Sequence, residues 1–111
     1  MSKASLHYAI IEFCQSNNYE LVQEYQFNPD RKFRADYYIP NLNCLIEYEG
    51  MGGKTKQGIG GHQTLKGYTS NCDKYNSACI LGFNLLRFTA KNTKTFHELI
   101  TKLKQTHETT N

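Results

Sequence analysis

The sequence predicts a single α/β domain in which a mixed four-stranded sheet is flanked by helices. Apolar residues recur at helical spacing in three segments, and four short segments are rich in aromatic and branched residues. Their order along the chain is helix, three strands, helix, strand, helix. A chain of 111 residues suffices for one hydrophobic core, which we expect to span about residues 5–104.

The first half of the chain predicts one helix and an antiparallel meander. The helix is expected over residues 5–17, where one apolar stripe has helical spacing: Leu6, Ala9, Ile10 and Phe13. Strands are expected over residues 20–27, 33–39 and 44–49. The two connectors between them contain proline and asparagine and are short enough for hairpins.

A glycine-rich loop and a second helix follow the meander. Six of the eight glycines lie between residues 50 and 61. The helix is expected from residue 62 or 64 to residue 81, with Gly82 as its stop. We expect its apolar stripe to pack on the core: Leu65, Tyr68, Cys72, Tyr75 and Cys79.

The last third of the chain predicts a strand over residues 83–89 and a third helix. Because this strand follows a helix, it can return to the sheet beside an earlier strand and make the sheet mixed. A capping box from Thr95 to Glu98 begins the final helix, and its polar end from Thr106 is expected to fray. Four residues are expected to face inward: Phe96, Leu99, Ile100 and Leu103.

Cysteine usage and hydropathy predict a soluble cytoplasmic protein without a membrane partner. The four cysteines form no CxxC pair, which favours reduced thiols, and Cys72 and Cys79 are expected in the core. The chain has neither a signal-peptide pattern nor an apolar run of membrane-spanning length. A zinc ribbon, a phosphate-binding P-loop and a dinucleotide fingerprint are all excluded by residue spacing.

Charge is distributed unevenly along the chain. The formal net charge is +3, but residues 51–97 contain seven bases and one acid, a balance of +6. Residues 20–50 contain six acids and three bases. An acidic cluster inside a basic chain is typical of a metal site on a polyanion-binding surface, although an ordinary solvated surface has the same composition.

Pairing the predicted strands aligns several of the acids across the sheet. If the first hairpin turns about Asp30, opposed residue numbers sum to about 60 and Glu24 lies opposite Asp36. If the second hairpin pairs residues that sum to about 83, Asp36 lies opposite Glu47. Adjacent carboxylates repel one another, so they require protonation, a partner such as Arg34, or a bound cation. Oxygen ligands at this density suit Mg²⁺ or Mn²⁺.

Five short motifs in this order resemble the PD-(D/E)XK nuclease superfamily, and particularly its small phage-type and very-short-patch-repair-like endonuclease domains. The likeness covers about residues 20–90, and its motifs are Phe33-Arg34-Ala35-Asp36-Tyr37-Tyr38, Ile46-Glu47-Tyr48-Glu49-Gly50, His62, Asp73-Lys74-Tyr75-Asn76 and Leu86-Arg87-Phe88-Thr89. It implies a restriction-endonuclease-like core with the order α-β-β-β-α-β, here followed by a C-terminal helix.

The resemblance implies roles for the acids in metal binding. Asp36 and Glu47 would be ligands of Mg²⁺ or Mn²⁺, and the Tyr48 carbonyl would supply a third oxygen. Glu24 would complete the acid set. Glu12 competes with Glu24 for this role, because the additional acid in this superfamily often comes from the first helix.

The resemblance also implies catalytic residues, with one departure from the family pattern. Glu49 stands where the family most often has lysine, and Lys74 on the second helix is the candidate to replace that positive charge. His62 or Glu49 would orient or deprotonate the attacking water. The residues expected to contact nucleic acid are Arg34, Lys54, Lys56, Asn71 and Lys74.

These observations lead us to expect a Mg²⁺-dependent DNA endonuclease that acts on duplex, mismatched or branched DNA. A domain of this size exposes few groups for sequence readout, so a homodimer is also expected. Two alternatives stay open. One is a non-catalytic nucleic-acid-binding module that retains the nuclease fold, and the other is a metal-stabilised interaction domain.

Overall fold

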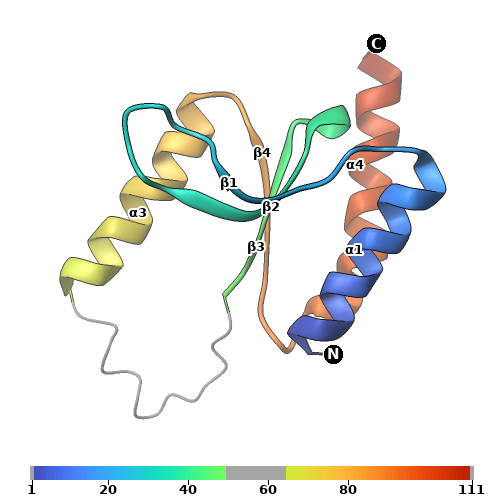
Figure 1. Cartoon of the computed structure of the whole chain (residues 1–111), viewed down its shortest axis with the longest axis horizontal. Coiled ribbons are helices and arrows are strands. Elements are labelled where there is room, and N and C mark those ends of the chain that lie inside the picture. Colours follow the sequence, from blue (N-terminus) through green and yellow to red (C-terminus); the bar gives the residue numbers. More distant parts are fainter. Residues whose placement is uncertain (1, 50–64, 111) are drawn as a thin grey trace.

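The structure, a computed structural model, describes residues 2–49 and 65–110 of the chain. Its elements follow the predicted order of helix, three strands, helix, strand, helix (Figure 1). They are α1 (Lys3–Asn17), β1 (Val22–Gln26), β2 (Arg34–Ile39), η1 (Pro40–Leu42), β3 (Cys44–Tyr48), α3 (Leu65–Ile80), β4 (Asn84–Phe88), η2 (Thr93–Thr95) and α4 (Phe96–Thr110). The described helices include none long and apolar enough to cross a membrane.

The sheet is mixed, as the sequence predicts, with strand order β1-β2-β3-β4. The first two pairings are antiparallel, and β4 returns through α3 to lie parallel to β3. Val22 lies opposite Tyr38, and Tyr37 lies opposite Ile46, so opposed residue numbers sum to 60 and to 83. Both predicted registers are therefore confirmed.

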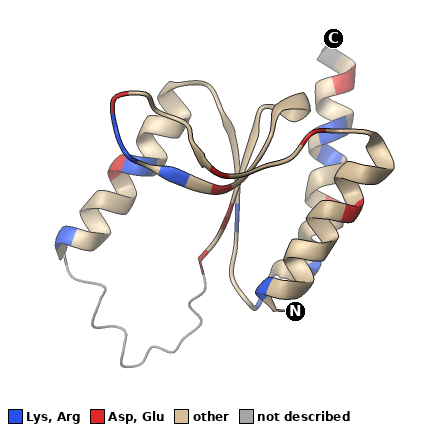
Figure 2. Cartoon of the chain, in the orientation of Figure 1, with Lys and Arg blue, Asp and Glu red and all other residues tan. Residues whose placement is uncertain are grey.

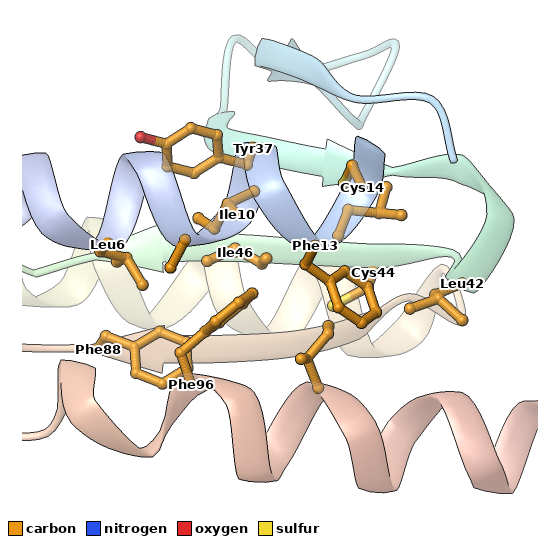
Figure 3. Close-up of a cluster of buried hydrophobic side chains, with 13 residues drawn as sticks. Leu6, Ile10, Phe13, Cys14, Tyr37, Leu42, Cys44, Ile46, Phe88 and Phe96 are labelled. Carbon is orange, nitrogen blue, oxygen red and sulfur yellow. The ribbon is translucent and has the colours of Figure 1, made fainter. Parts of the chain in front are cut away.

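Helices cover both faces of the sheet, and each face has its own core. The larger core lies between the sheet, α1 and α4, where Leu6, Ile10, Phe88 and Phe96 meet (Figure 3). The smaller core includes a residue of α3, which Figure 1 shows on the opposite side of the sheet from α1 and α4. Its buried residues are Phe27, Ala35, Leu45 and Ala78. The better-packed face thus holds two helices, and the other face holds only the crossover helix.

The stripe predicted for α1 is buried, because Leu6, Ala9, Ile10 and Phe13 all face the larger core. The helix begins two residues earlier than predicted. The hydroxyl of Ser2 accepts a hydrogen bond from the Ser5 backbone N–H at 3.2 Å and so provides the N-cap. The helix ends at Asn18, which takes the left-handed conformation with φ of 57°.

The stripe predicted for α3 does not pack on the core, and this expectation is wrong. Leu65 is 80% exposed and Tyr68 is 62% exposed, and Cys72 and Cys79 are exposed as well. Ala78 is the one described α3 residue that is buried. The helix is rotated because the sheet face beneath it contains charged side chains, which the polar side of α3 meets. Gly82 has φ of 88° and ends the segment as predicted.

The final helix packs as predicted but differs at both ends. Its expected capping box is absent, because the Thr95 backbone N–H and hydroxyl both donate to the Asn92 carbonyl, at 3.0 and 2.7 Å. The helix also continues past Thr106 to Thr110. Thr106 donates to the Lys102 carbonyl at 3.0 Å, and an ion pair between Lys104 and Glu108 spans the last turns.

The exposure of the cysteines predicts two classes of thiol in dilute solution. We expect Cys72 and Cys79 to react rapidly with a thiol-specific reagent, and Cys14 and Cys44 to react slowly. Burial raises the pKa of Cys14 to about 11 and that of Cys44 to about 12, so the reactive thiolate is scarce in both. Mass-spectrometric mapping of labelled peptides measures the four rates. If Cys72 or Cys79 were as protected as Cys44, the rotation of α3 described above would be wrong.

Candidate functional site

Register places three acids side by side across the meander, but the row is distorted at one end. The register of the neighbouring pairs aligns Asp36 with Glu24 of β1 and with Glu47 of β3, but neither of these two pairs is part of its ladder. Glu24 has φ of 52°, and it is exposed. The left-handed backbone interrupts the ladder between β1 and β2. Asp36 and Glu47 therefore form the better-ordered part of the predicted row.

Asp36 lies at the point where the β2–β3 ladder ends. Its Oδ2 accepts a hydrogen bond from the backbone N–H of Tyr48 at 2.8 Å, beyond the last ladder pair of Tyr37 with Ile46. This bond attaches the carboxylate to the end of β3 and restricts its orientation. The same strand end carries Glu47 and Glu49, so the fold gathers three carboxylates within a short distance along two neighbouring strands.

Glu47 is a buried carboxylate that α3 neutralises. It is 7% exposed, and its Oε2 lies 2.8 Å from Nζ of Lys74. This ion pair holds the buried Oε2 of Glu47 against the ammonium group of Lys74. Burial raises the pKa of Glu47, and the charges of Asp36 and Glu49 add to the rise, whereas Lys74 opposes it.

Glu49 has a separate set of partners. Its Oε2 accepts hydrogen bonds from the Tyr75 hydroxyl at 2.8 Å and from Arg87 Nε at 2.9 Å. The Arg87 guanidinium stacks over the Tyr75 ring at 3.8 Å. Burial and the bond to Glu49 raise the pKa of Tyr75, and the bond to Glu49 raises that of Arg87. This triad orients Glu49 at the carboxyl end of β3.

Sequence reasoning did not assign Arg87 a role, although a signal was present. Arg87 is the one charged residue in the apolar run from Asn84 to Phe88, as Glu47 is in β3. The parallel register places these two residues side by side. Opposite charges at matching positions of two apolar strands favour such a juxtaposition.

A pocket of about 380 Å³ opens beside Asp36, between α1 and the first two strands. Lys3 and His7 line it from the first turns of α1, and Glu24 and Asp36 line it from the sheet. His7 is half-buried, and its Nδ1 lies 2.8 Å from the Tyr37 hydroxyl. The fold thus brings Lys3 and His7, which the motif pattern did not identify, into the pocket that Glu24 and Asp36 also line.

Other predicted site residues lie apart from this cluster or outside the described chain. Glu12 lines a different groove, together with His97, so it is not positioned to compete with Glu24. Arg34 is exposed, and its Nη1 donates to the Glu24 carbonyl at 3.4 Å. Asn71 is exposed on α3, whereas Lys74 is occupied by Glu47. The expectations for Lys54, Lys56 and His62 lie outside the described residues.

The residues present fit a hard divalent cation only with additional ligands. Residues 2–49 and 65–110 contain no group of three or more histidine, cysteine or acidic side chains arranged to hold a metal ion. Magnesium, however, is commonly bound through one or two carboxylates, with water and substrate phosphate completing the shell. Asp36 and Glu47 can supply these one or two carboxylates, because both are acids and they lie on adjacent strands. Figure 2 shows acidic residues on the central strands and basic residues on α3 and at the start of α1.

Comparisons with protein-family models, with curated proteins and with solved structures find no match for this chain. The geometry of the site is therefore the basis for any functional conclusion. Three carboxylates on two strands are each held by a different group. The backbone of β3 holds Asp36, Lys74 holds Glu47, and the pair of Tyr75 and Arg87 holds Glu49.

Removal of Lys74 should destabilise the fold. In Lys74→Met, Glu47 is buried without a counter-charge, and we expect the free energy of unfolding to fall by about 3 kcal/mol at neutral pH in metal-free buffer. Urea denaturation measures this change. The double variant Glu47→Gln/Lys74→Met buries no charge and should recover most of the loss. A Lys74→Met protein as stable as wild type would contradict the ion pair.

The raised pKa of Glu47 also predicts a pH dependence. Folded Glu47 binds its proton more tightly than the unfolded chain does, so its contribution to stability is largest below its ordinary pKa of 4.5. That contribution is lost as the pH rises through the folded pKa. Relative to Glu47→Gln, wild type should therefore lose stability as the pH rises from 4.5 towards neutrality. If the difference in stability between wild type and Glu47→Gln stayed constant from pH 4.5 to neutrality, the pKa of Glu47 in the folded protein would be ordinary and the prediction would be wrong.

Proposed function

We propose that the protein is a metal-dependent phosphodiesterase that cleaves DNA, with Mg²⁺ or Mn²⁺ as its cofactor. The observation that carries this proposal is the cluster of Asp36 and Glu47 on adjacent strands with Lys74 against Glu47. A buried carboxylate is costly, and a second acid beside it raises the cost. An arrangement that costs stability is more readily explained by chemistry than by packing.

The position of Lys74 supports its role as the replacement for the lysine that the nuclease motif normally contains. In the nuclease family that this sequence resembles, lysine most often occupies the motif position at which this chain has Glu49. The side chain at that position is therefore negative where a positive charge is expected. Lys74 reaches the same group of acids from α3, with Nζ at 2.8 Å from Glu47. A cation at this place balances the acids in the free protein and can approach the oxygens of a bound phosphate.

Each residue of the cluster would have its own role in the reaction. Asp36 and Glu47 would hold the divalent cation, which supplies charge neutralisation at the scissile phosphate and lowers the pKa of a bound water. Lys74 would keep Glu47 ionised. Tyr75 and Arg87 hold Glu49 through Oε2, and Glu49 would accept a hydrogen bond from the attacking water.

DNA as the substrate class is supported by charge around the cluster. The balance of +6 over residues 51–97 favours a polyanion. Lys3 and His7 line the pocket on the other side of Asp36, where a phosphate next to the scissile one would find donors. Basic groups thus lie on both sides of the acids, which suits a strand that passes across the carboxyl end of β3.

A second candidate function, a nucleic-acid-binding module without catalysis, is favoured by one observation. Glu47 and Glu49 already have cationic partners within the protein, Lys74 and Arg87. The acids therefore do not need a metal ion for charge balance alone. The two functions differ in metal dependence, because binding to phosphates through basic residues needs no divalent cation, whereas hydrolysis does.

Asp36→Asn tests the proposed activity. The amide oxygen can still accept the Tyr48 N–H, but the negative charge that would hold the cation is lost. We expect Mn²⁺-dependent cleavage to fall by about 100-fold or more, with DNA affinity changed by less than about threefold. Nicking of supercoiled plasmid, a mismatched duplex and a four-way junction, each with Mn²⁺ or EDTA, measures the activity.

The matched control is Glu12→Gln, which removes an exposed acid from the other side of α1 and should leave cleavage unchanged. Wild-type rates in Asp36→Asn would contradict the assignment of Asp36. If the wild-type protein binds these substrates but never nicks them with either metal, the binding module is the function.

A further inference from the structure

The pocket between α1 and the first two strands combines basic, aromatic and acidic side chains. We call it the α1 pocket and define it by five of its lining residues: Lys3, His7, Tyr8, Glu24 and Asp36. Its volume of about 380 Å³ is in the range of cavities that hold small ligands. The proposed reaction uses Asp36 for the cation and the two basic residues for a phosphate, so it leaves Tyr8 and Glu24 without a role.

Tyr8 lines the α1 pocket with an exposed aromatic ring. Its side chain is 69% exposed. The ring meets that of His7 edge to face, with centroids 5.4 Å apart and planes at 70°. This contact restricts the Tyr8 ring and leaves most of it open to solvent. Exposed aromatic rings with basic groups nearby are the surfaces on which unpaired bases stack.

Lys3 connects the α1 pocket to the end of β3. Its Nζ lies 6.0 Å from the centre of the Tyr48 ring, and the Tyr48 backbone N–H donates to Asp36 at 2.8 Å. Lys3 and Tyr8 are five residues apart on α1, which is about 7.5 Å along the helix axis. A phosphate beside Lys3 and a base stacked on Tyr8 can therefore belong to the same nucleotide.

Glu24 supplies a carboxylate on the sheet side of the α1 pocket. Burial raises the pKa of the Tyr37 hydroxyl, and the charges of Asp36 and Glu24 add to the rise. Both acids therefore act on the hydroxyl that lies 2.8 Å from His7 Nδ1. Within residues 2–49 and 65–110, the Glu24 carboxylate forms no ion pair. An ionised carboxylate accepts hydrogen bonds and donates none, so Glu24 favours a ligand group that donates.

We infer that the α1 pocket holds one unpaired nucleotide of the DNA that the protein cleaves, with the base on Tyr8, a base amino group donating to Glu24, and the phosphate beside Lys3. The identity of the polymer as DNA rests on the proposed function. A base inside a duplex is paired and stacked on both faces, so it enters a pocket only after leaving the stack. The preferred substrate is therefore DNA that already contains an unpaired nucleotide.

The chemistry of Glu24 also selects among the bases. Cytosine and adenine carry exocyclic amino groups that donate hydrogen bonds, whereas thymine presents a carbonyl oxygen at the corresponding place. The pocket therefore prefers an unpaired cytosine or adenine to an unpaired thymine. Glu24 then recognises the base and is not a metal ligand, which agrees with the interruption of the β1–β2 ladder at its left-handed backbone.

Binding in EDTA tests the α1 pocket without any need for cleavage. The probes are labelled duplexes of equal length that contain a bulged cytosine, a bulged thymine, a bulged abasic site or no bulge. Fluorescence anisotropy should show that the cytosine bulge binds about tenfold more tightly than the abasic bulge, which keeps the backbone but lacks the base. The thymine bulge should lie between them, and the duplex without a bulge should bind most weakly. Equal affinity for the cytosine and abasic bulges would overturn the inference.

Variants of Tyr8 test the stacking contact. Tyr8→Ala should bind the cytosine bulge as weakly as wild type binds the abasic bulge, and its affinity for the abasic bulge should be unchanged. Tyr8→Phe keeps the ring and should bind as wild type does. Circular dichroism verifies that each variant is folded. A Tyr8→Ala protein that still prefers the cytosine bulge would refute the stacking contact.

Variants of Glu24 and Lys3 test the two ends of the nucleotide. The amide of Glu24→Gln donates as well as accepts, so this variant should bind the cytosine and thymine bulges equally. Lys3→Gln should weaken binding to all four duplexes alike, because a phosphate contact does not depend on the base. Wild type that fails to distinguish cytosine from thymine, or Glu24→Gln that still does, would refute base recognition by Glu24.

Two further measurements separate the α1 pocket from other interpretations. Unlabelled deoxycytidine monophosphate should displace the cytosine-bulge duplex only at far higher concentration than the unlabelled duplex does. Competition at equal concentrations would show that the pocket takes free mononucleotides, and DNA would be the wrong ligand. The Mn²⁺-dependent nicking assay decides the proposed function separately. A protein that nicks DNA without preferring the bulged base keeps that function and loses the pocket, whereas one that prefers the bulged base and never nicks keeps the pocket alone.

Discussion

The ion pair between Glu47 of β3 and Lys74 of α3 determines how the crossover helix lies on the sheet. A carboxylate that is 7% exposed is costly to keep ionised without a nearby cation, and in residues 2–49 and 65–110 it is Lys74 that forms the ion pair with it. The helix must therefore present Lys74 to the sheet, and Ala78, one turn later, is buried with it. The other features of this face follow from that one orientation.

The orientation of α3 that pairs Lys74 with Glu47 also determines which of its other residues contact the candidate site and which are exposed to solvent. When Lys74 faces inward, Tyr75 reaches Glu49 at 2.8 Å and supports Arg87 by stacking. The apolar stripe that includes Leu65 and Cys72 then has no place on the sheet and lies outside. A charged site on one side of α3 and exposed apolar residues on the other are consequences of a single helix orientation.

Much of the candidate site could be predicted before the fold was known. The position of Asp36 between Glu24 and Glu47 followed from the two hairpin turns, because connectors this short leave few registers open. Lys74 was predicted as well, from its place in the sequence motif. Lys3 and His7 were not, because they belong to α1 and line the pocket beside Asp36 only as a result of the packing of α1 on the sheet.

The sequence by itself determined the element order, the mixed sheet and both hairpin registers. These depend on local periodicity, on turn chemistry and on the strand alternation that apolar residues reveal. Only the tertiary structure decided which side of α3 meets the sheet. Helical spacing identifies an apolar stripe but not the surface that it contacts, and here Lys74 and Ala78 face the sheet, where Lys74 neutralises Glu47, while Leu65 and Tyr68 are exposed. A charge on one strand thus overrode the hydrophobic pattern of a helix distant in sequence.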